Sequence, residues 1–248
     1  MSGYKNFAIV GAGVTGSFVV RQFLKDKAVG TVNEVVVLTR QVSLVVLALL
    51  HVSLAHQLWQ GSKTTFEGDA KVIPVDYSDK ESVKSALSGI DVVISTIAQV
   101  ALRSQEVIAV AAKEAGVKLF VPSEFGTPTE GAMEGYFVEK AGIQGHLKAV
   151  GIPYALFYTG AFADFVWHAY VASFSATFLR HLNSQWCRSL GLDVTSGKVY
   201  VGGDGNKQIP FTSRTDIARY ISYVLTHLPA EQLNNRSFNV AGDTKVRD

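Results

Sequence analysis

Residues 6–40 read NFAIVGAGVTGSFVVRQFLKDKAVGTVNEVVVLTR. The apolar run at 6–10 predicts a buried strand, and a helical stretch and a second strand follow it. Between them, Gly11 permits a tight turn, Gly13 lets a pyrophosphate approach the backbone, and Gly16 lets the helix pack closely on the strand. The helix N-terminus offers unpaired N–H groups to phosphates. This stretch therefore predicts a dinucleotide-binding turn.

The end of the second strand indicates which dinucleotide is bound. NAD-specific domains place Asp or Glu there, against the ribose 2′-hydroxyl, whereas this chain has Thr39 and Arg40 and no carboxylate nearby. A guanidinium suits the 2′-phosphate of NADP. Arg40 can also be read as a solvated charge at a strand end. The sequence predicts NADPH/NADP as the cofactor.

Helices and strands alternate after this unit. A Ser78-Asp79-Lys80-Glu81 capping box is expected to open the helix that follows the third strand. The further expected elements are strands at 71–77, 91–98 and 117–126 and helices at 81–89 and 104–116. Unbroken apolar strands between helices predict an α/β fold: a doubly wound, mostly parallel Rossmann-type sheet that binds its ligand at the carboxyl ends of the strands.

The pattern changes in the second half of the chain. Strands are expected at 151–162, 197–203, 208–212 and 236–242, with a helix at 214–228 that Asp216 supports at its N-terminus. We interpret residues 1–155 as an NADP-binding domain. Residues 156–248 would supply the remaining strands and a smaller C-terminal substrate lobe that is apparently truncated.

Two segments do not fit the alternation. Residues 41–62 carry no charge and approach the length of a membrane span, yet they connect two strands of one sheet, where only a short soluble crossover fits. Residues 166–190 have no assignable periodicity. We interpret one or both as insertions, as a gene model that retains intron sequence would produce.

Composition limits the partners and the compartment. The formal charge of +2 comes from scattered Lys and Arg, which disfavours nucleic acid as a partner. A single cysteine, Cys187, excludes an internal disulfide. The first expected strand begins close to Met1, which leaves no room for a signal peptide. The six histidines lack metal-ligand spacing. We expect a cytoplasmic protein, monomeric or homodimeric, without a structural metal or a membrane anchor.

Three residues could carry chemistry: Ser123 after the fifth strand, and Tyr136 and Lys140 on the next segment. The last two lie one helical turn apart, and the apolar stripe of that helix places Lys140 inward. Burial lowers the pKa of an ammonium, which suits a general acid/base or a donor to ribose hydroxyls. A neighbouring cation eases ionisation of Tyr136, and Ser123 could orient a substrate oxygen. Alternatively Lys140 reaches solvent, Tyr136 precedes the helix, and Ser123 only turns the chain.

Several strings together resemble one family. GAGVTG, STIAQ, AAKEAGVKLFVPSEFG, the spacing from Lys140 to GIPY, and TGAFADF are similar to the isoflavone reductase-like and NmrA-like branch of the short-chain dehydrogenase/reductases. The resemblance covers residues 5–40, 63–165 and 191–244. It implies a Rossmann-type fold, NADPH as hydride donor, and Lys140 in the place of the catalytic lysine. That branch commonly works without the superfamily's tyrosine, which would make Tyr136 incidental.

Residues 96–99 and 122–125 would then lie along the nicotinamide. The expected cofactor contacts are Gly11, Gly13, Val14, Thr15, Gly16, Thr39, Arg40, Thr96, Ile97, Ala98, Gln99, Pro122, Ser123, Phe125 and Lys140. The main prediction is an NADPH-dependent reductase that transfers hydride to a small apolar, aromatic or conjugated substrate. The alternative is an NmrA-like module that senses NADP(H), regulates a protein partner and performs no turnover.

Overall fold

A computed structural model describes residues 3–40, 69–133, 137–164, 192–193, 198–199 and 209–245. The sheet strands are β1 (Asn6–Val10), β2 (Glu34–Arg40), β3 (Lys71–Val75), β4 (Val92–Ser95), β5 (Leu119–Val121), β6 (Ala155–Tyr158) and β11 (Arg236–Asn239). The helices are α1 (Gly16–Ala28), α4 (Lys80–Ala86), η1 (Gln99–Ala101), α5 (Ser104–Glu114), α6 (Phe137–Val150), α10 (Arg214–His227) and α11 (Ala230–Leu233). Tyr136 and the segments 41–62 and 166–190 lie outside the described residues.

The central sheet is parallel, with strand order β3-β2-β1-β4-β5. A parallel bridge between Phe120 and Tyr154 continues it to β6, which pairs in parallel with β11. The order reverses beside β1, because β2 and β4 flank it on opposite sides. In open α/β sheets, ligands bind outside the carboxyl ends of the strands at such a point. The predicted fold class is confirmed.

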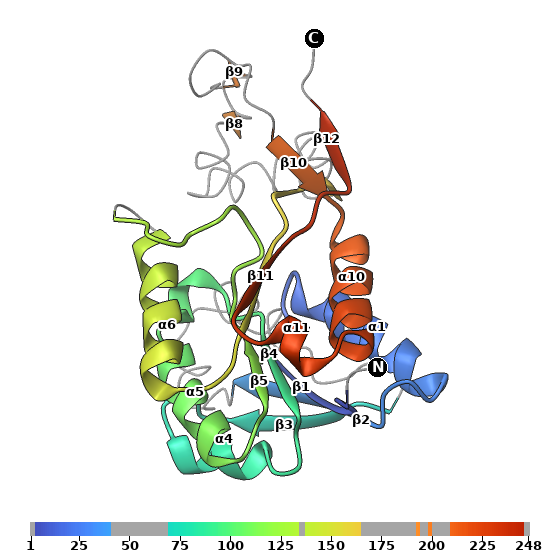
Figure 1. Cartoon of the computed structure of the whole chain (residues 1–248), viewed down its shortest axis with the longest axis vertical. Helices are drawn as coiled ribbons and strands as arrows, with labels where there is room; N and C mark the ends of the chain where they lie inside the picture. Colours follow the sequence, from blue (N-terminus) through green and yellow to red (C-terminus); the bar gives the residue numbers. More distant parts are fainter. Residues whose placement is uncertain are drawn as a thin grey trace, which may run out of the picture.

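Helices cover both faces of the sheet (Figure 1). Phe7 and Ile9 of β1 pack on one face against α1 and α10, where Phe23 and Ile221 are fully buried. Alternate strand residues pack on the other face against α4, α5 and α6. Because successive side chains of a strand point to opposite faces, the apolar runs of the sequence fill both layers.

Five short strands complete the described chain: β7 (Ala161–Phe162), β8 (Leu192–Asp193), β9 (Lys198–Val199), β10 (Ile209–Thr212) and β12 (Asp243–Lys245). β10 pairs with β7 in parallel and with β12 in antiparallel. This small sheet lies beyond the carboxyl ends of the parallel strands, above them in Figure 1. The predicted strand 151–162 is thus divided, because Thr159 and Gly160 separate β6 from β7.

The expected cap of α4 was wrong by one residue. Asp79, not Ser78, is the N-cap, and its carboxylate accepts hydrogen bonds from the amides of Glu81 and Ser82. The Ser78 hydroxyl instead donates to Asp76. Aspartate and serine cap about equally well, so the competing contact decides between them.

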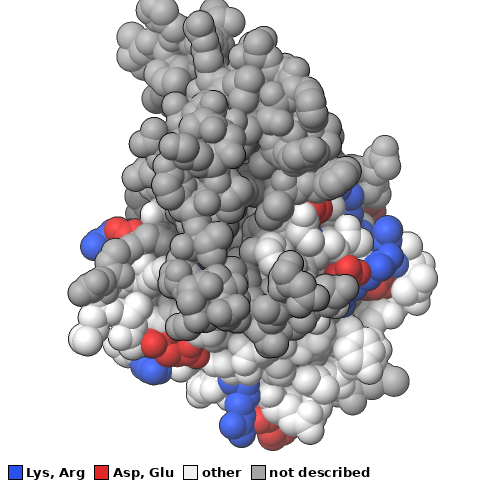
Figure 2. Space-filling view, turned by 90° about the horizontal axis from the view of Figure 1, so that it is seen from above, with Lys and Arg blue, Asp and Glu red and all other residues white. Residues whose placement is uncertain are grey.

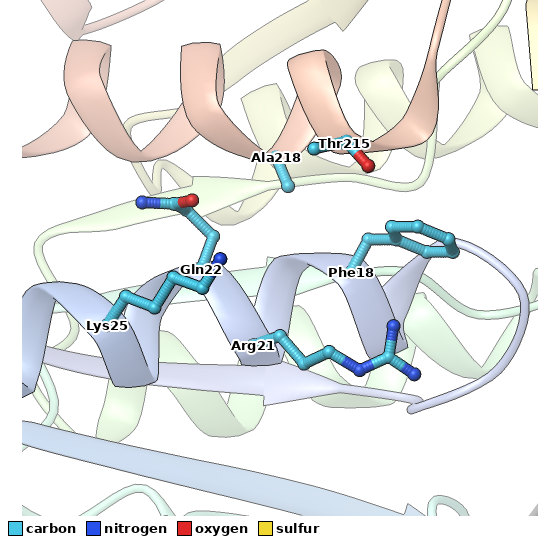
Figure 3. A pocket seen from close by; sticks show the side chains of 6 residues that line it. All are labelled: Phe18, Arg21, Gln22, Lys25, Thr215 and Ala218. Atoms are coloured by element: carbon cyan, nitrogen blue, oxygen red, sulfur yellow. The ribbon is translucent and has the colours of Figure 1, made fainter.

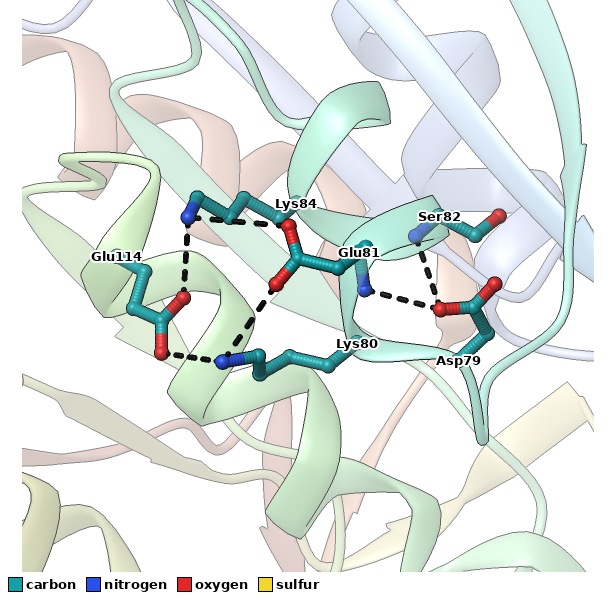
Figure 4. A network of polar contacts seen from close by, with 6 residues as sticks. All are labelled: Asp79, Lys80, Glu81, Ser82, Lys84 and Glu114. Atoms are coloured by element: carbon teal, nitrogen blue, oxygen red, sulfur yellow. Dashed lines mark hydrogen bonds and ion pairs between the residues drawn. The ribbon is translucent and has the colours of Figure 1, made fainter.

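An ion-pair network links the surfaces of α4 and α5 (Figure 4). Glu114 accepts from Lys80 at 2.7 Å and from Lys84 at 3.1 Å. These pairs are exposed. Among the described residues on the face seen in Figure 2, positive and negative side chains are likewise interspersed. Within the described ranges, no helix combines the length and the apolarity needed to cross a membrane.

Candidate functional site

The turn after β1 requires glycine at two positions. Gly11 has φ +88°, a left-handed conformation, and its amide donates to the Leu38 carbonyl at 2.9 Å. A Cβ on Gly16 would stand 2.1 Å from the Gly11 carbonyl oxygen. The first turn of α1 therefore packs directly on the backbone that leaves β1, as the spacing predicts.

The N-terminus of α1 is suited to an anion. Thr15 is the N-cap but makes no side-chain capping hydrogen bond, and the first turn carries no acidic residue. A Cβ on Gly13 would meet nothing within 4 Å, and Val14 is 58% exposed. The positive end of the helix dipole and the open space beside Gly13 favour a phosphate here. The turn therefore fits the diphosphate of a dinucleotide.

The segment after β4 is bonded to this turn. The Thr96 hydroxyl lies 2.5 Å from the Gly11 carbonyl oxygen and 3.2 Å from that of Val10. Ile97 is buried, whereas Ala98 and Gln99 are exposed. Residues 96–99 thus border the carboxyl edge beside the glycine turn.

At the end of β2, the two predicted contacts differ in exposure: Thr39 is buried and Arg40 is exposed. The Tyr77 hydroxyl donates to the Leu38 carbonyl at 2.9 Å, the same oxygen that accepts the Gly11 amide. Burial raises the pKa of Tyr77 to about 12, and the nearby charge of Arg40 opposes that rise. Tyr77 is therefore linked to the glycine turn through the Leu38 carbonyl.

Ser123 follows β5 and faces the segment after β4. Its hydroxyl donates to the Ile97 carbonyl at 2.9 Å, and its amide donates to the Gln105 side chain at 2.8 Å. Pro122 is buried, and Phe125 is buried with φ 37°, which is unusual for a residue other than glycine. The chain therefore turns sharply at 122–125.

Lys140 of α6 is buried, with 7% of its surface exposed. Its ammonium donates to the main-chain carbonyl of Glu124. Burial lowers the pKa of Lys140, and the Glu124 carboxylate partly opposes this effect. The inward placement predicted from the apolar stripe is thereby confirmed.

Around Glu124 is a buried polar cluster that consists of Glu124, Thr129, Gln144 and Tyr158. Thr129 and Gln144 each donate to the Glu124 carboxylate at 2.8 Å, and Gln144 also lies 2.8 Å from the Thr129 hydroxyl. The Tyr158 hydroxyl is 3.4 Å from the Gln144 amide. Burial raises the pKa of Tyr158, and its hydrogen bond with Glu130 raises that pKa further. The carboxylate beside Lys140 is therefore bonded to neutral donors.

Comparisons with known proteins show the family of the chain. The model of the NmrA-like family matches residues 4–245. The chain belongs to the NmrA-like family. Phenylcoumaran benzylic ether reductase POP1 of Populus trichocarpa is 37% identical over 153 residues, which are 58% of this chain and 44% of that protein. This NmrA-like chain thus spans less than half the length of that relative.

Solved structures share the fold of the NmrA-like chain. One described as isoflavone reductase superposes with a TM-score of 0.66 at 21% identity, covering 97% of this chain and 70% of that one. Another, AtPrR2 with NADP+ and (+)pinoresinol, has a TM-score of 0.62 at 24% identity, covering 97% and 71%. The family resemblance read from the sequence is confirmed.

Sequence reasoning missed several residues that organise the site of this NmrA-like chain. Gln105, Thr129 and Gln144 are buried polar side chains with site partners. Gln144 carries a readable signal, since it follows Lys140 by one helical turn on the same face. Thr129 lies in a loop and gives no such signal.

Proposed function

We propose that this chain binds NADPH and belongs to an NADPH-dependent reductase of small apolar, aromatic or conjugated molecules. The observation that carries the proposal is the buried Lys140, which lies on α6 beside the chain leaving β5, in a fold whose glycine turn fits a diphosphate. The proposal agrees with relatives named as reductases and with a structural neighbour described with NADP+ and (+)pinoresinol.

The cofactor would lie across the carboxyl edge of the sheet. The amides at the start of α1 would bind its diphosphate, and the exposed guanidinium of Arg40 would pair with its 2′-phosphate. Residues 96–99 and 122–125 would border the nicotinamide. When bound, NADPH supplies the hydride.

Lys140 would manage the proton. An ammonium with a lowered pKa gives up its proton more readily than an exposed lysine, so it is the better general acid. Ser123 would orient a substrate oxygen, although its hydroxyl already donates to Ile97 in this structure. We retain Tyr136 only as a candidate second acid, and the division into 1–155 and 156–248 as a proposed domain boundary.

The first test is a titration of the purified chain with NADPH and NADH, with Arg40→Ala alongside. We expect the wild type to prefer NADPH and the variant to lose that preference, because only NADPH carries the 2′-phosphate. A wild type that binds neither dinucleotide would refute the proposal.

The second test is turnover of NADPH with a panel of conjugated and aromatic acceptors. We expect wild-type turnover that Lys140→Ala abolishes. Equal, tight binding of NADPH and NADP+ without any turnover would favour the sensing module instead.

A further inference from the structure

Arg214 lies at the start of α10 and only 8% of it is exposed. Its Nε donates to Oδ2 of Asp164 at 2.5 Å, and its backbone amide donates to Oδ1 of the same carboxylate at 3.1 Å. Asp164 follows β7 closely in the chain. One carboxylate thus binds both the main chain and the side chain of Arg214, which determines the direction of the guanidinium.

The guanidinium reaches the glycine turn. Nη1 of Arg214 donates to the Val14 carbonyl at 3.3 Å, joining residues 200 positions apart. Its Cζ lies 4.8 Å from the ring centre of Phe18, which Arg21 also contacts at 5.3 Å. Phe18 and Arg21 lie on α1 beside a shallow groove whose opposite side is the first turns of α10, where Thr215 follows Arg214 (Figure 3).

The contact with Val14 affects the orientation of the next amide. In a planar trans peptide, the carbonyl of one residue and the N–H of the next point in opposite directions. When the Val14 carbonyl points to Arg214, the Thr15 N–H points away from Arg214. Asp164 balances the charge of Arg214, so the effect of the pair is one of orientation more than of added positive charge.

We propose that Arg214, oriented by Asp164, is a positioning residue for the diphosphate of the dinucleotide: it directs the Thr15 amide toward that group. This inference rests on the proposed function, since it requires a dinucleotide at the glycine turn. The proposal also makes the start of α10 a determinant of cofactor affinity.

Calorimetric titration of the full chain with NADPH, NADH and 2′-AMP tests the proposal. Arg214→Lys keeps the charge but loses the planar fork, and Asp164→Asn removes the carboxylate that orients it. We expect both variants to weaken NADPH and NADH by the same factor, about tenfold, and to leave 2′-AMP unchanged because it has no diphosphate. Arg40→Ala should show the opposite pattern, weakening NADPH and 2′-AMP but not NADH.

Arg219→Ala is the matched control, since Arg219 lies on the same helix with 63% of its side chain exposed. It should bind all three ligands as the wild type does. Unchanged NADPH and NADH affinity in a folded Arg214→Lys or Asp164→Asn would overturn the inference alone, as would an equal loss of 2′-AMP. A wild type that binds no dinucleotide would overturn both this inference and the proposed function.

Discussion

Gln144 donates a 2.8 Å hydrogen bond to the carboxylate of Glu124, one helical turn beyond the lysine that bonds the main-chain carbonyl of the same residue. The two contacts place Lys140 and Gln144 on one partner. Glu124 therefore links α6 to the chain leaving β5.

Removing the amide should change the proton chemistry of Lys140. In Gln144→Leu the Glu124 carboxylate loses one donor, so more of its charge is available to stabilise the neighbouring ammonium. We expect the pKa of Lys140 to rise and the corresponding limb of the pH dependence of kcat/KM to move to higher pH. Glu139→Gln, on the exposed side of the same helix, should leave the profile unchanged. Coincident profiles for Gln144→Leu and wild type would contradict the prediction.

The stability of the fold should depend on pH through Lys140. Its pKa is lowered in the folded state, so the unfolded chain retains the proton to higher pH and unfolding becomes less favourable as pH rises toward the ordinary value of 10.5. Lys140→Met has no titrating group at this position, so its stability lacks this pH dependence. Urea unfolding between pH 7 and 10 should show wild type gaining stability relative to the variant as pH increases. A constant difference across that range would contradict the assignment.

Two glycines of the turn should respond differently to alanine. In Gly16→Ala the new Cβ meets the Gly11 carbonyl at 2.1 Å, and we expect a loss of about 2 kcal/mol or more in the free energy of unfolding. In Gly13→Ala the Cβ meets no protein atom within 4 Å, so stability should be nearly unchanged while NADPH affinity falls. Chemical denaturation and cofactor titration measure the two effects. Normal stability of Gly16→Ala would refute the close packing of α1.

Asp91 should stabilise the amino ends of the parallel strands. Its carboxylate accepts the amides of Lys5 and Asn6 at 2.8 and 3.0 Å and the ammonium of Lys118 at 2.7 Å. Burial raises its pKa, but these bonds outweigh burial and lower it overall. We expect Asp91→Ala to cost about 2 kcal/mol at neutral pH.

The cost of Asp91→Ala should shrink as pH falls. The stability that a carboxylate with a lowered pKa contributes is fully present above its ordinary value of 3.8 and is lost as pH drops through the folded-state value. Lys118→Met removes only the more exposed partner and should cost less than the loss of Asp91. A pH-independent cost would mean that packing, not charge, determines the effect.

The sheet could be predicted from the sequence because its signals are local. The glycine spacing, the apolar strand runs and the helix stripes each depend on neighbouring residues, and together they leave few topologies. Short elements were less predictable. β12 and α11 have only a few residues each, and the cap of α4 depended on a contact between Ser78 and Asp76 that no local rule specifies.

The site was only partly predictable for the same reason. The burial of Lys140 could be predicted because its helix has an apolar stripe, and the position of Arg40 because it ends a strand. The cluster around Glu124 forms only when the chain leaving β5, a loop and two further elements meet. Asp164 and Arg214 are 50 positions apart in the chain, and no spacing rule links them.

The pairing of α1 with α10 has a consequence for synthesis. When the first two hundred residues have left the ribosome, the glycine turn is complete, but the helix that covers Val19 and Phe23 has not yet been made. Contacts between distant segments form slowly, and apolar surface exposed in the meantime promotes aggregation. The nascent chain therefore depends on residues 214–227 to bury the helix next to the turn.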